Sequence, residues 1–278
     1  MNISVIIPTF ERKHLIGRAL DSVLKQTHPA REVIVIDDGS SDGTAGWIKK
    51  SYPSIILIDQ KNRGVSAARN TGIRNAKSKW VALLDSDDEW LPEKLETQGK
   101  LLQKNKDKLF CHTNEIWIRN GVRVNPMKKH QKFGGMIFNE CLDICRISPS
   151  SSLFCRALLD DVGWFDETLP ICEDYDLWLR VTAKYPVLFV DEPLIIKYGG
   201  HSDQLSRKPG GIEQYRIKAL ENILSSASLK NSDCISAIKM LIKKLDILMA
   251  GSKKRGNIDQ VNEVHEKIRN WEKQLSEL

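Results

Sequence analysis

The stretch that decides the fold is WVALLDSDDEW, residues 80–90. Its first five residues are mostly apolar and include no turn former, which predicts a buried strand over residues 80–84. Ligands of open α/β sheets bind beyond the carboxyl ends of the strands, and two carboxylates there can share a divalent cation with a substrate phosphate. We therefore predict a metal site at Asp85 and Asp87, which follow this strand directly.

The chain before this stretch alternates between strand and helix patterns. Strands are predicted over residues 3–7, 32–36 and 55–58, and helices over residues 12–26 and 65–76. This alternation predicts a parallel sheet with right-handed crossovers, an architecture that is common among nucleotide-binding proteins.

The first two turns narrow the class of ligand. Pro8-Thr9-Phe10-Glu11 stands where a dinucleotide dehydrogenase needs a G-x-G-x-x-G, and the chain has no Walker A loop. Asp37 and Asp38 follow the second strand and lead into a glycine- and serine-rich turn. We therefore expect them at the carboxyl ends of the strands, over the same crevice as Asp85 and Asp87. We predict that Asp37 only caps this turn.

The middle of the chain predicts a series of shorter elements and then a second acidic cluster. The elements are helices over residues 92–104, 133–145 and 156–162, a hairpin of residues 109–118 and 122–124, a loop entering a strand over residues 148–154, and strands over residues 187–190 and 194–198. Glu173 and Asp174 then fall in the first turn of a predicted helix, where capping and catalysis are both compatible with carboxylates. The loop over residues 199–206 carries His201 after two glycines and could close over a ligand.

The last part of the chain, residues 213–278, shows no strand signal and no proline. Apolar residues at spacings of three and four predict two amphipathic helices, separated near residues 251–256. These helices either form a hairpin with each other or pack against a partner. Homodimerisation through these helices is one hypothesis. Because residues 239–255 hold six basic residues against one acid, peripheral contact with an anionic membrane is another, although a solvated helix face is the simpler interpretation.

Composition sets broad limits on the class of protein. With 278 residues, 41% hydrophobic and 28% charged, the chain is an ordinary globular sequence. The first strand begins at residue 3 and no apolar run reaches about 20 residues, so we expect a cytoplasmic protein without a signal peptide or a membrane span. The net charge of +6 is compatible with anionic ligands but does not require them. The six cysteines lack zinc-site spacing and are predicted to be reduced thiols.

Five motifs in this order resemble the family 2 glycosyltransferases of the GT-A fold. They are VIIPTFER, VIVIDDGSSDGT, NRGVSAARNTGI, ALLDSDD and ICEDYDLWLR, and they cover the chain up to about residue 206. The resemblance implies a Rossmann-like nucleotide-binding mixed sheet flanked by helices, an α/β fold, with residues 213–278 as an all-α extension. It divides a domain of residues 1–212 into a nucleotide-sugar-binding half, residues 1–105, and an acceptor-binding half, residues 106–212.

The resemblance also implies which residues bind the nucleotide. Pro8, Thr9 and Glu11 would line the nucleoside pocket, although many relatives have Asn-Arg where this chain has Glu-Arg at positions 11 and 12. Asp38 would bind the base. Arg69 would lie near the nucleotide and its diphosphate.

The resemblance also implies the metal ligands and the catalytic residue. Asp85 would lie near the ribose or the metal, Asp87 would bind Mn²⁺ or Mg²⁺, and His201 would complete the metal sphere. Asp174 would be the general base. The chemistry is suitable, because a divalent cation neutralises a diphosphate leaving group and a carboxylate can take the proton of an attacking hydroxyl.

The function that these residues predict is inverting, metal-dependent transfer of a sugar. The donor would be a nucleotide diphospho-sugar, with UDP as the usual carrier, and the acceptor a saccharide or a lipid-linked saccharide in cell-surface polysaccharide or glycoconjugate synthesis. Nucleic acid is not an expected partner. The alternative function is a non-catalytic sugar-nucleotide sensor or scaffold that acts through its C-terminal helices, and the combination of Asp87 with Asp174 argues against it.

Overall fold

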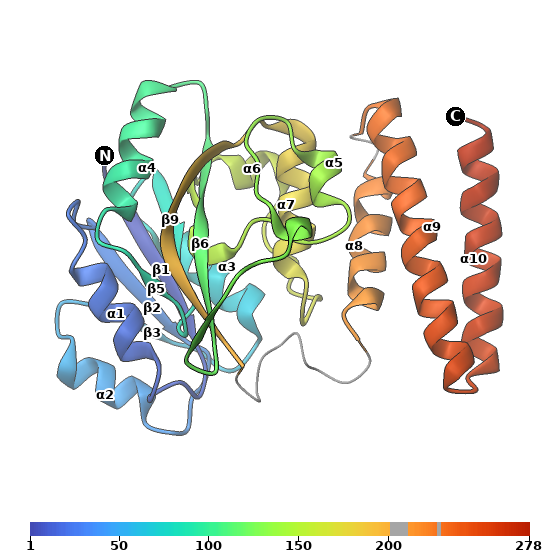
Figure 1. The fold of residues 1–278 in the computed structure, drawn as a ribbon. Coiled ribbons are helices and arrows are strands. Elements are labelled where there is room, and N and C mark those ends of the chain that lie inside the picture. The colour runs from blue at the N-terminus through green and yellow to red at the C-terminus, as the bar shows by residue number, and fades with distance from the viewer. Residues whose placement is uncertain (201–210, 227–228) are drawn as a thin grey trace.

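A computed structural model describes residues 1–200, 211–226 and 229–278 of the chain. The described residues form one mixed sheet of nine strands in the order β3-β2-β1-β4-β8-β6-β9-β5, with β7 paired to β6 (Figure 1). The strands are β1 (Ile3–Thr9), β2 (Glu32–Asp37), β3 (Ile56–Asp59), β4 (Trp80–Leu83), β5 (Glu89–Trp90), β6 (Phe110–Arg119), β7 (Val122–Val124), β8 (Leu153–Cys155) and β9 (Leu188–Gly199).

The first four strands are parallel, as the alternating pattern predicts. Thr9 lies opposite Asp37, and Asp37 lies opposite Asp59, so the carboxyl ends of β1, β2 and β3 meet at one edge. Strand β4 is aligned with β1 through Ile6 and Leu83, which brings the acidic run after β4 to the same edge. The second half of the sheet is mixed, because β8 runs antiparallel to both β4 and β6, whereas β9 runs parallel to β6.

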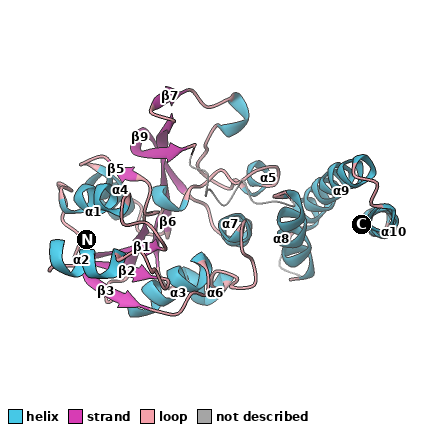
Figure 2. Cartoon of the chain, turned by 90° about the horizontal axis from the view of Figure 1, so that it is seen from below, coloured by secondary structure: helices cyan, strands magenta, loops and turns pink. Residues whose placement is uncertain are grey.

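Helices cover both faces of the sheet (Figure 2). Alternate residues of β1 point to opposite faces, so that Ile7 packs with α1 and α4 while Ile6 packs with α3. The helices are α1 (Ile16–Leu24), α2 (Thr44–Ser51), α3 (Val65–Asn75), α4 (Lys94–Lys104), α5 (Phe138–Cys141), α6 (Leu158–Val162), α7 (Glu173–Lys184), α8 (Glu213–Ser225), α9 (Asn231–Lys254) and α10 (Ile258–Ser276). Because β1 is buried along its whole length, the site residues at its carboxyl end rest on a rigid base.

Two predictions for the middle of the chain are wrong. The predicted helix over residues 133–145 shrinks to α5, because Gly135 exchanges two backbone hydrogen bonds with Val187 and has a φ of +92°. This bridge holds the segment extended against the sheet. The predicted strands over residues 187–190 and 194–198 form the single strand β9, which accommodates the intervening residues by register shifts around Asn114 of β6.

The C-terminal region contains the predicted hairpin, which α9 and α10 form, and also the helix α8, which the sequence analysis did not separate. The three helices stand side by side at the end of the molecule away from α1 and α2 (Figure 1). Leu220 of α8 and Leu241 of α9 are fully buried in the core that includes α7. In the described ranges every helix is too short or too polar to span a bilayer.

Candidate functional site

The loop after β4 places three acids at the carboxyl edge of the sheet. The Leu84 amide donates to the Ile6 carbonyl at 3.0 Å, which carries the parallel pairing to the start of the loop. Ser150 then fixes the loop from the other side, because its hydroxyl accepts from the Asp85 amide at 3.1 Å and donates to Asp88 Oδ2 at 2.6 Å. The loop is therefore held in one conformation before any ligand binds.

Asp87 is the acid of this loop that is free to bind a ligand. Within the described ranges no other residue donates a hydrogen bond to its carboxylate, whereas Asp85 is bound by Arg69 and Asp88 by Ser150. Burial, together with the charge of Asp85, raises the pKa of the Asp87 carboxyl. A carboxylate that is costly to leave ionised and has no donor of its own is suited to a cation.

The donor set fits a hard divalent cation. Two carboxylates two residues apart supply oxygen ligands, which Mg²⁺ and Mn²⁺ prefer, and substrate phosphates commonly supply further ones. No group of three or more His, Cys, Asp or Glu side chains suited to a metal occurs in the described part of the chain. The predicted third ligand, His201, lies outside the described residues, so a full coordination sphere stays a prediction.

Arg69 of α3 joins the two acidic clusters that the sequence analysis predicts. Its guanidinium lies 2.7 Å from Asp85 Oδ1 and 2.5 Å from Glu173 Oε1, and the side chain is 4% exposed. The charges of these two carboxylates raise the pKa of Arg69 although burial opposes them. Arg69 is therefore a permanent cation beside the loop after β4, and its predicted position near the nucleotide and its diphosphate stays a prediction.

Asp174 lies in the first turn of α7, as predicted. Its Oδ1 accepts from the Tyr175 amide at 2.7 Å, and its Oδ2 lies 3.4 Å from the thiol of Cys145. Burial and the charge of Asp174 raise the pKa of Cys145 well above its usual range, so Cys145 remains a protonated thiol. Its single hydrogen has two acceptors within reach, the Asp174 carboxylate and the Ile147 carbonyl at 3.3 Å. These contacts orient Asp174, and capping alone does not account for the thiol.

Two buried polar atoms lie unpartnered where the resemblance implies a nucleoside. Among the described residues, Thr9 Oγ1 and Asp37 Oδ2 have no hydrogen-bond partner, and their residues are 3% and 2% exposed. Thr9 and Asp37 are neighbours across β1 and β2. The other oxygen of Asp37 accepts from the Ser40 amide at 2.8 Å, which confirms its capping of the turn. The unpartnered atoms are suited to the polar groups of a ligand.

The carboxylates of Glu11 and Asp38 accept hydrogen bonds from other residues of the chain. Glu11 accepts from the amide and hydroxyl of Ser41 at 2.7 and 2.9 Å and has a φ of +53°. Asp38 accepts from Gln60 and from the amides of residues 63 and 64. Pro8, the remaining residue predicted to line the nucleoside pocket, lies buried within β1, which extends past it to Thr9. Direct contact of these residues with a nucleoside stays a prediction.

The sequence reasoning missed Lys197, Glu115, Ser148, Ser150 and Cys145. The carboxylates of Glu115, Asp88, Asp85 and Asp174 raise the pKa of Lys197, although burial opposes them. A lysine at an ordinary strand position belongs to no motif, so the sequence does not mark Lys197 as a site residue. The serine-rich run over residues 148–152 was visible, but its contacts with Glu115 and Asp88 depend on the sheet order.

A model of the family described as glycosyl transferase family 2 matches residues 4–163, which is more than half of the chain. The chain belongs to glycosyl transferase family 2. An uncharacterized glycosyltransferase of Rickettsia felis is 33% identical to this family 2 chain over 213 residues, which are 74% of this chain and 35% of the relative. The chain thus spans about a third of the length of that relative.

A curated relative and a solved structure give two further comparisons. The Escherichia coli protein WfgD, a UDP-Glc:alpha-D-GlcNAc-diphosphoundecaprenol beta-1,3-glucosyltransferase, is 34% identical over 181 residues, or 64% of this chain and 69% of WfgD. S. aureus TarS 1-349, solved in complex with UDP-GlcNAc, superposes with a TM-score of 0.67 at 19% identity, over 97% of this chain and 92% of that one. The second likeness confirms the GT-A type of mixed sheet with C-terminal helices.

Proposed function

We propose that this chain transfers a hexose from a nucleotide diphospho-sugar to an acceptor hydroxyl with inversion of configuration, in the synthesis of a cell-surface polysaccharide or glycoconjugate. The observation that carries the proposal is the bridge made by Arg69. It joins Asp85, in the loop suited to a cation and a diphosphate, to Glu173, the neighbour of the proposed base Asp174. Both parts of a transferase site are therefore held together by one buried side chain.

The relatives support the choice of substrates. WfgD is named for UDP-Glc and for an acceptor linked to diphosphoundecaprenol, and TarS was solved with UDP-GlcNAc. We infer that the donor of this chain is a UDP-sugar and that its acceptor is a saccharide on a lipid diphosphate. The unpartnered Thr9 and Asp37 oxygens supply polar contacts for the nucleoside end of such a donor.

Asp174 acts as the base in a single displacement. Its carboxylate takes the proton of the acceptor hydroxyl while the oxygen forms a bond to the anomeric carbon of the sugar. The bond from that carbon to the diphosphate oxygen breaks on the opposite side, and the diphosphate leaves with the electron pair. Cys145 and the Tyr175 amide hold Asp174 in position for this transfer. One displacement inverts the configuration.

Asp87, with Asp85, would hold Mn²⁺ or Mg²⁺ in this site. A bound divalent cation supplies charge neutralisation for the diphosphate as it leaves. The chain contributes the prepared loop, because Ser150 fixes Asp85 and Asp88 while no other described residue donates a hydrogen bond to the Asp87 carboxylate.

The test compares Asp174→Asn, Asp87→Asn and a control, Asp160→Asn, which changes an exposed acid of α6. UDP release from a panel of UDP-sugars is measured with GlcNAc-diphospholipid as the acceptor and with Mn²⁺ present. We expect Asp174→Asn and Asp87→Asn each to lose at least about 10²-fold in rate, with circular dichroism unchanged, and the control to retain its rate.

Full activity of either variant would remove the function assigned to that residue. Tight UDP binding without turnover of any donor would favour the sugar-nucleotide sensor instead of the transferase.

A further inference from the structure

Lys197 is a cation of the site that neither the motifs nor the family comparison assigns. It lies near the carboxyl end of β9, and the preceding residue, Ile196, pairs with Glu89 of β5. The following residue, Tyr198, donates its amide to Asp88 Oδ1 at 3.3 Å. Strand β9 thereby places Lys197 next to the end of the loop that carries Asp85, Asp87 and Asp88.

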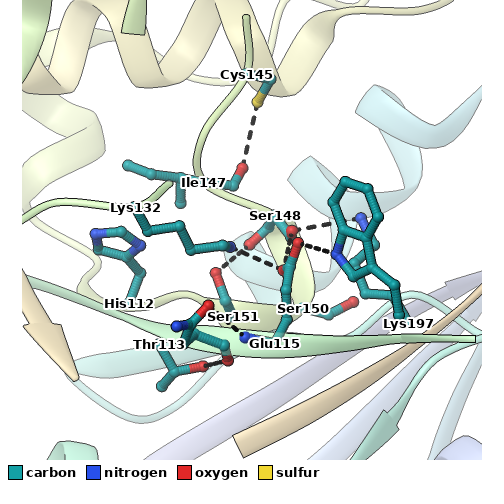
Figure 3. Close-up of polar contacts among 12 residues, drawn as sticks. His112, Thr113, Glu115, Lys132, Cys145, Ile147, Ser148, Ser150, Ser151 and Lys197 are labelled. Carbon is teal, nitrogen blue, oxygen red and sulfur yellow. Dashed lines mark hydrogen bonds and ion pairs between the residues drawn. The ribbon is translucent and has the colours of Figure 1, made fainter. Parts of the chain in front are cut away.

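A buried polar chain fixes the Lys197 ammonium. Lys197 Nζ donates to Ser148 Oγ at 3.3 Å, and Ser148 donates in turn to Glu115 Oε2 at 2.5 Å. Lys132 approaches the same carboxylate from the opposite side, at 2.8 Å (Figure 3). The Lys132 and Glu115 side chains are 4% and 5% exposed. Because Lys132 already neutralises Glu115, Ser148 holds Lys197 in place without neutralising it.

The Lys197 ammonium interacts electrostatically with the acids of the site, but it forms no direct ion pair with a described one. Its ammonium interacts electrostatically with Asp85, Asp88 and Asp174, and it also acts on Asp87. Within the described ranges, however, no carboxylate lies within 4.0 Å of it, in contrast to the contacts of 2.5–2.8 Å that Arg69 and Lys132 make. An ammonium has three N–H donors, and the described residues accept from one of them. Among the described residues, the other two donors have no acceptor.

We propose that Lys197 binds the diphosphate of the sugar donor, between the loop of Asp85 and Asp87 and the base Asp174. This inference rests on the proposed function. A cation at this point lies where negative charge develops as the diphosphate leaves, and such fixed charges stabilise the transition state. A lysine that only balanced the acids would contact a carboxylate directly, as Arg69 does.

The test measures the affinity for UDP and UMP by calorimetry, in EDTA and again with Mn²⁺, so that no turnover is needed. The variants are Lys197→Met, Lys197→Arg and a control, Lys184→Met, which changes a lysine at the end of α7 that pairs with Asp161. We expect Lys197→Met to weaken UDP binding by at least about tenfold, the effect of one charged hydrogen bond, and to change UMP binding less. Lys197→Arg should restore most of the affinity, and the control should match the unmodified protein.

Equal UDP binding by Lys197→Met and the unmodified protein would overturn the inference alone. A rise only in the KM for a lipid diphosphate acceptor, with UDP affinity unchanged, would also overturn it, because the ligand would then be the acceptor's phosphate. Failure of the unmodified protein to bind any nucleoside diphosphate would overturn the proposed function, and this inference with it. Melting curves of all variants identify any loss of affinity that comes from unfolding.

Discussion

Arg69 Nη1 lies 2.5 Å from Glu173 Oε1, although 104 positions of sequence separate the two residues. The same guanidinium contacts Asp85 at 2.7 Å, so one side chain of α3 connects the loop after β4 to the first turn of α7. The spacing between the loop after β4 and the first turn of α7 therefore depends on a buried ion triad.

Replacing Arg69 by Met should destabilise the fold as well as the site. It leaves Glu173, whose side chain is 6% exposed, and Asp85, whose side chain is 26% exposed, without their cation. Breaking a buried ion pair typically costs about 3–5 kcal/mol. Urea unfolding measures the loss. Arg74→Met is the control, because Arg74 has a side chain 53% exposed and lies 3.8 Å from its partner Glu167, and a change below about 1 kcal/mol is expected there. Equal stability of the two variants would contradict the structural importance of the triad.

Cys145→Ala should lower kcat while the donor KM stays the same. The thiol holds Asp174 but does not touch the predicted nucleotide pocket, and one neutral hydrogen bond is worth roughly 0.5–1.5 kcal/mol, or about two- to tenfold in rate. Steady-state kinetics with Cys145→Ser, which keeps a donor, should show partial recovery. Cys234→Ala, on α9, serves as the control. An unchanged kcat in Cys145→Ala would show that Asp174 is positioned by other contacts.

Gly72→Ala should destabilise the packing of α3 on the parallel part of the sheet. A Cβ at this position of α3 would collide with Ile6 of β1 and Ile36 of β2, and overpacking of this kind costs about 1–3 kcal/mol. Gly99→Ala is the matched control on α4, where no described atom lies within 4 Å of the new methyl group and helix propensity favours alanine by roughly 0.8–1 kcal/mol. Chemical denaturation should show that Gly72→Ala is less stable and Gly99→Ala more stable than the unmodified protein, and no loss of stability in Gly72→Ala would show that α3 is not closely packed on the sheet.

The stability of the chain should fall at acidic pH partly through Glu115. Burial opposes its ionisation, but Lys132 and Lys197 together with the Ser148 hydroxyl lower its pKa from 4.5 to about 2. A carboxyl whose folded pKa lies below its unfolded pKa contributes stability that is complete above pH 4.5 and is lost as the pH falls toward 2. Between about pH 6 and pH 3 the loss is on the order of 2 kcal/mol.

Urea unfolding of Glu115→Gln over this pH range isolates the effect. The variant is less stable at neutral pH because Lys132 loses its partner, and the difference from the unmodified protein should shrink as the pH falls. Parallel pH profiles of the two proteins would show that Glu115 does not titrate with a lowered pKa.

The parts of the fold that repeat a simple pattern could be predicted from the sequence. The parallel strands β1 to β4 are continuous apolar runs, and each ends in a polar turn that marks the ligand edge. The segment over residues 133–145 could not be predicted in the same way. Its apolar residues are compatible with a helix, and the bridge from Gly135 to Val187, 52 positions away, holds it extended.

The same distinction between local patterns and long-range contacts applies to the residues of the candidate site. Asp85, Asp87 and Asp174 lie at ends of elements, in motifs that can be read locally, and in the structure Arg69 contacts Asp85 and also Glu173, the neighbour of Asp174. Lys197 and Glu115 occupy ordinary strand positions, and their importance depends on which strands are neighbours in the sheet. The parallel pairing of β6 with β9 brings them together, and no local pattern predicts that pairing.

The most direct test of the central claim is a thermal-shift measurement with UDP, GDP and dTDP, each with and without Mn²⁺. A ligand that binds only the folded chain raises the melting temperature. We expect a rise with UDP that becomes larger when Mn²⁺ is present and that loses this metal dependence in Asp87→Asn. No shift with any nucleoside diphosphate, under either condition, would contradict the assignment of the site to a sugar-nucleotide donor.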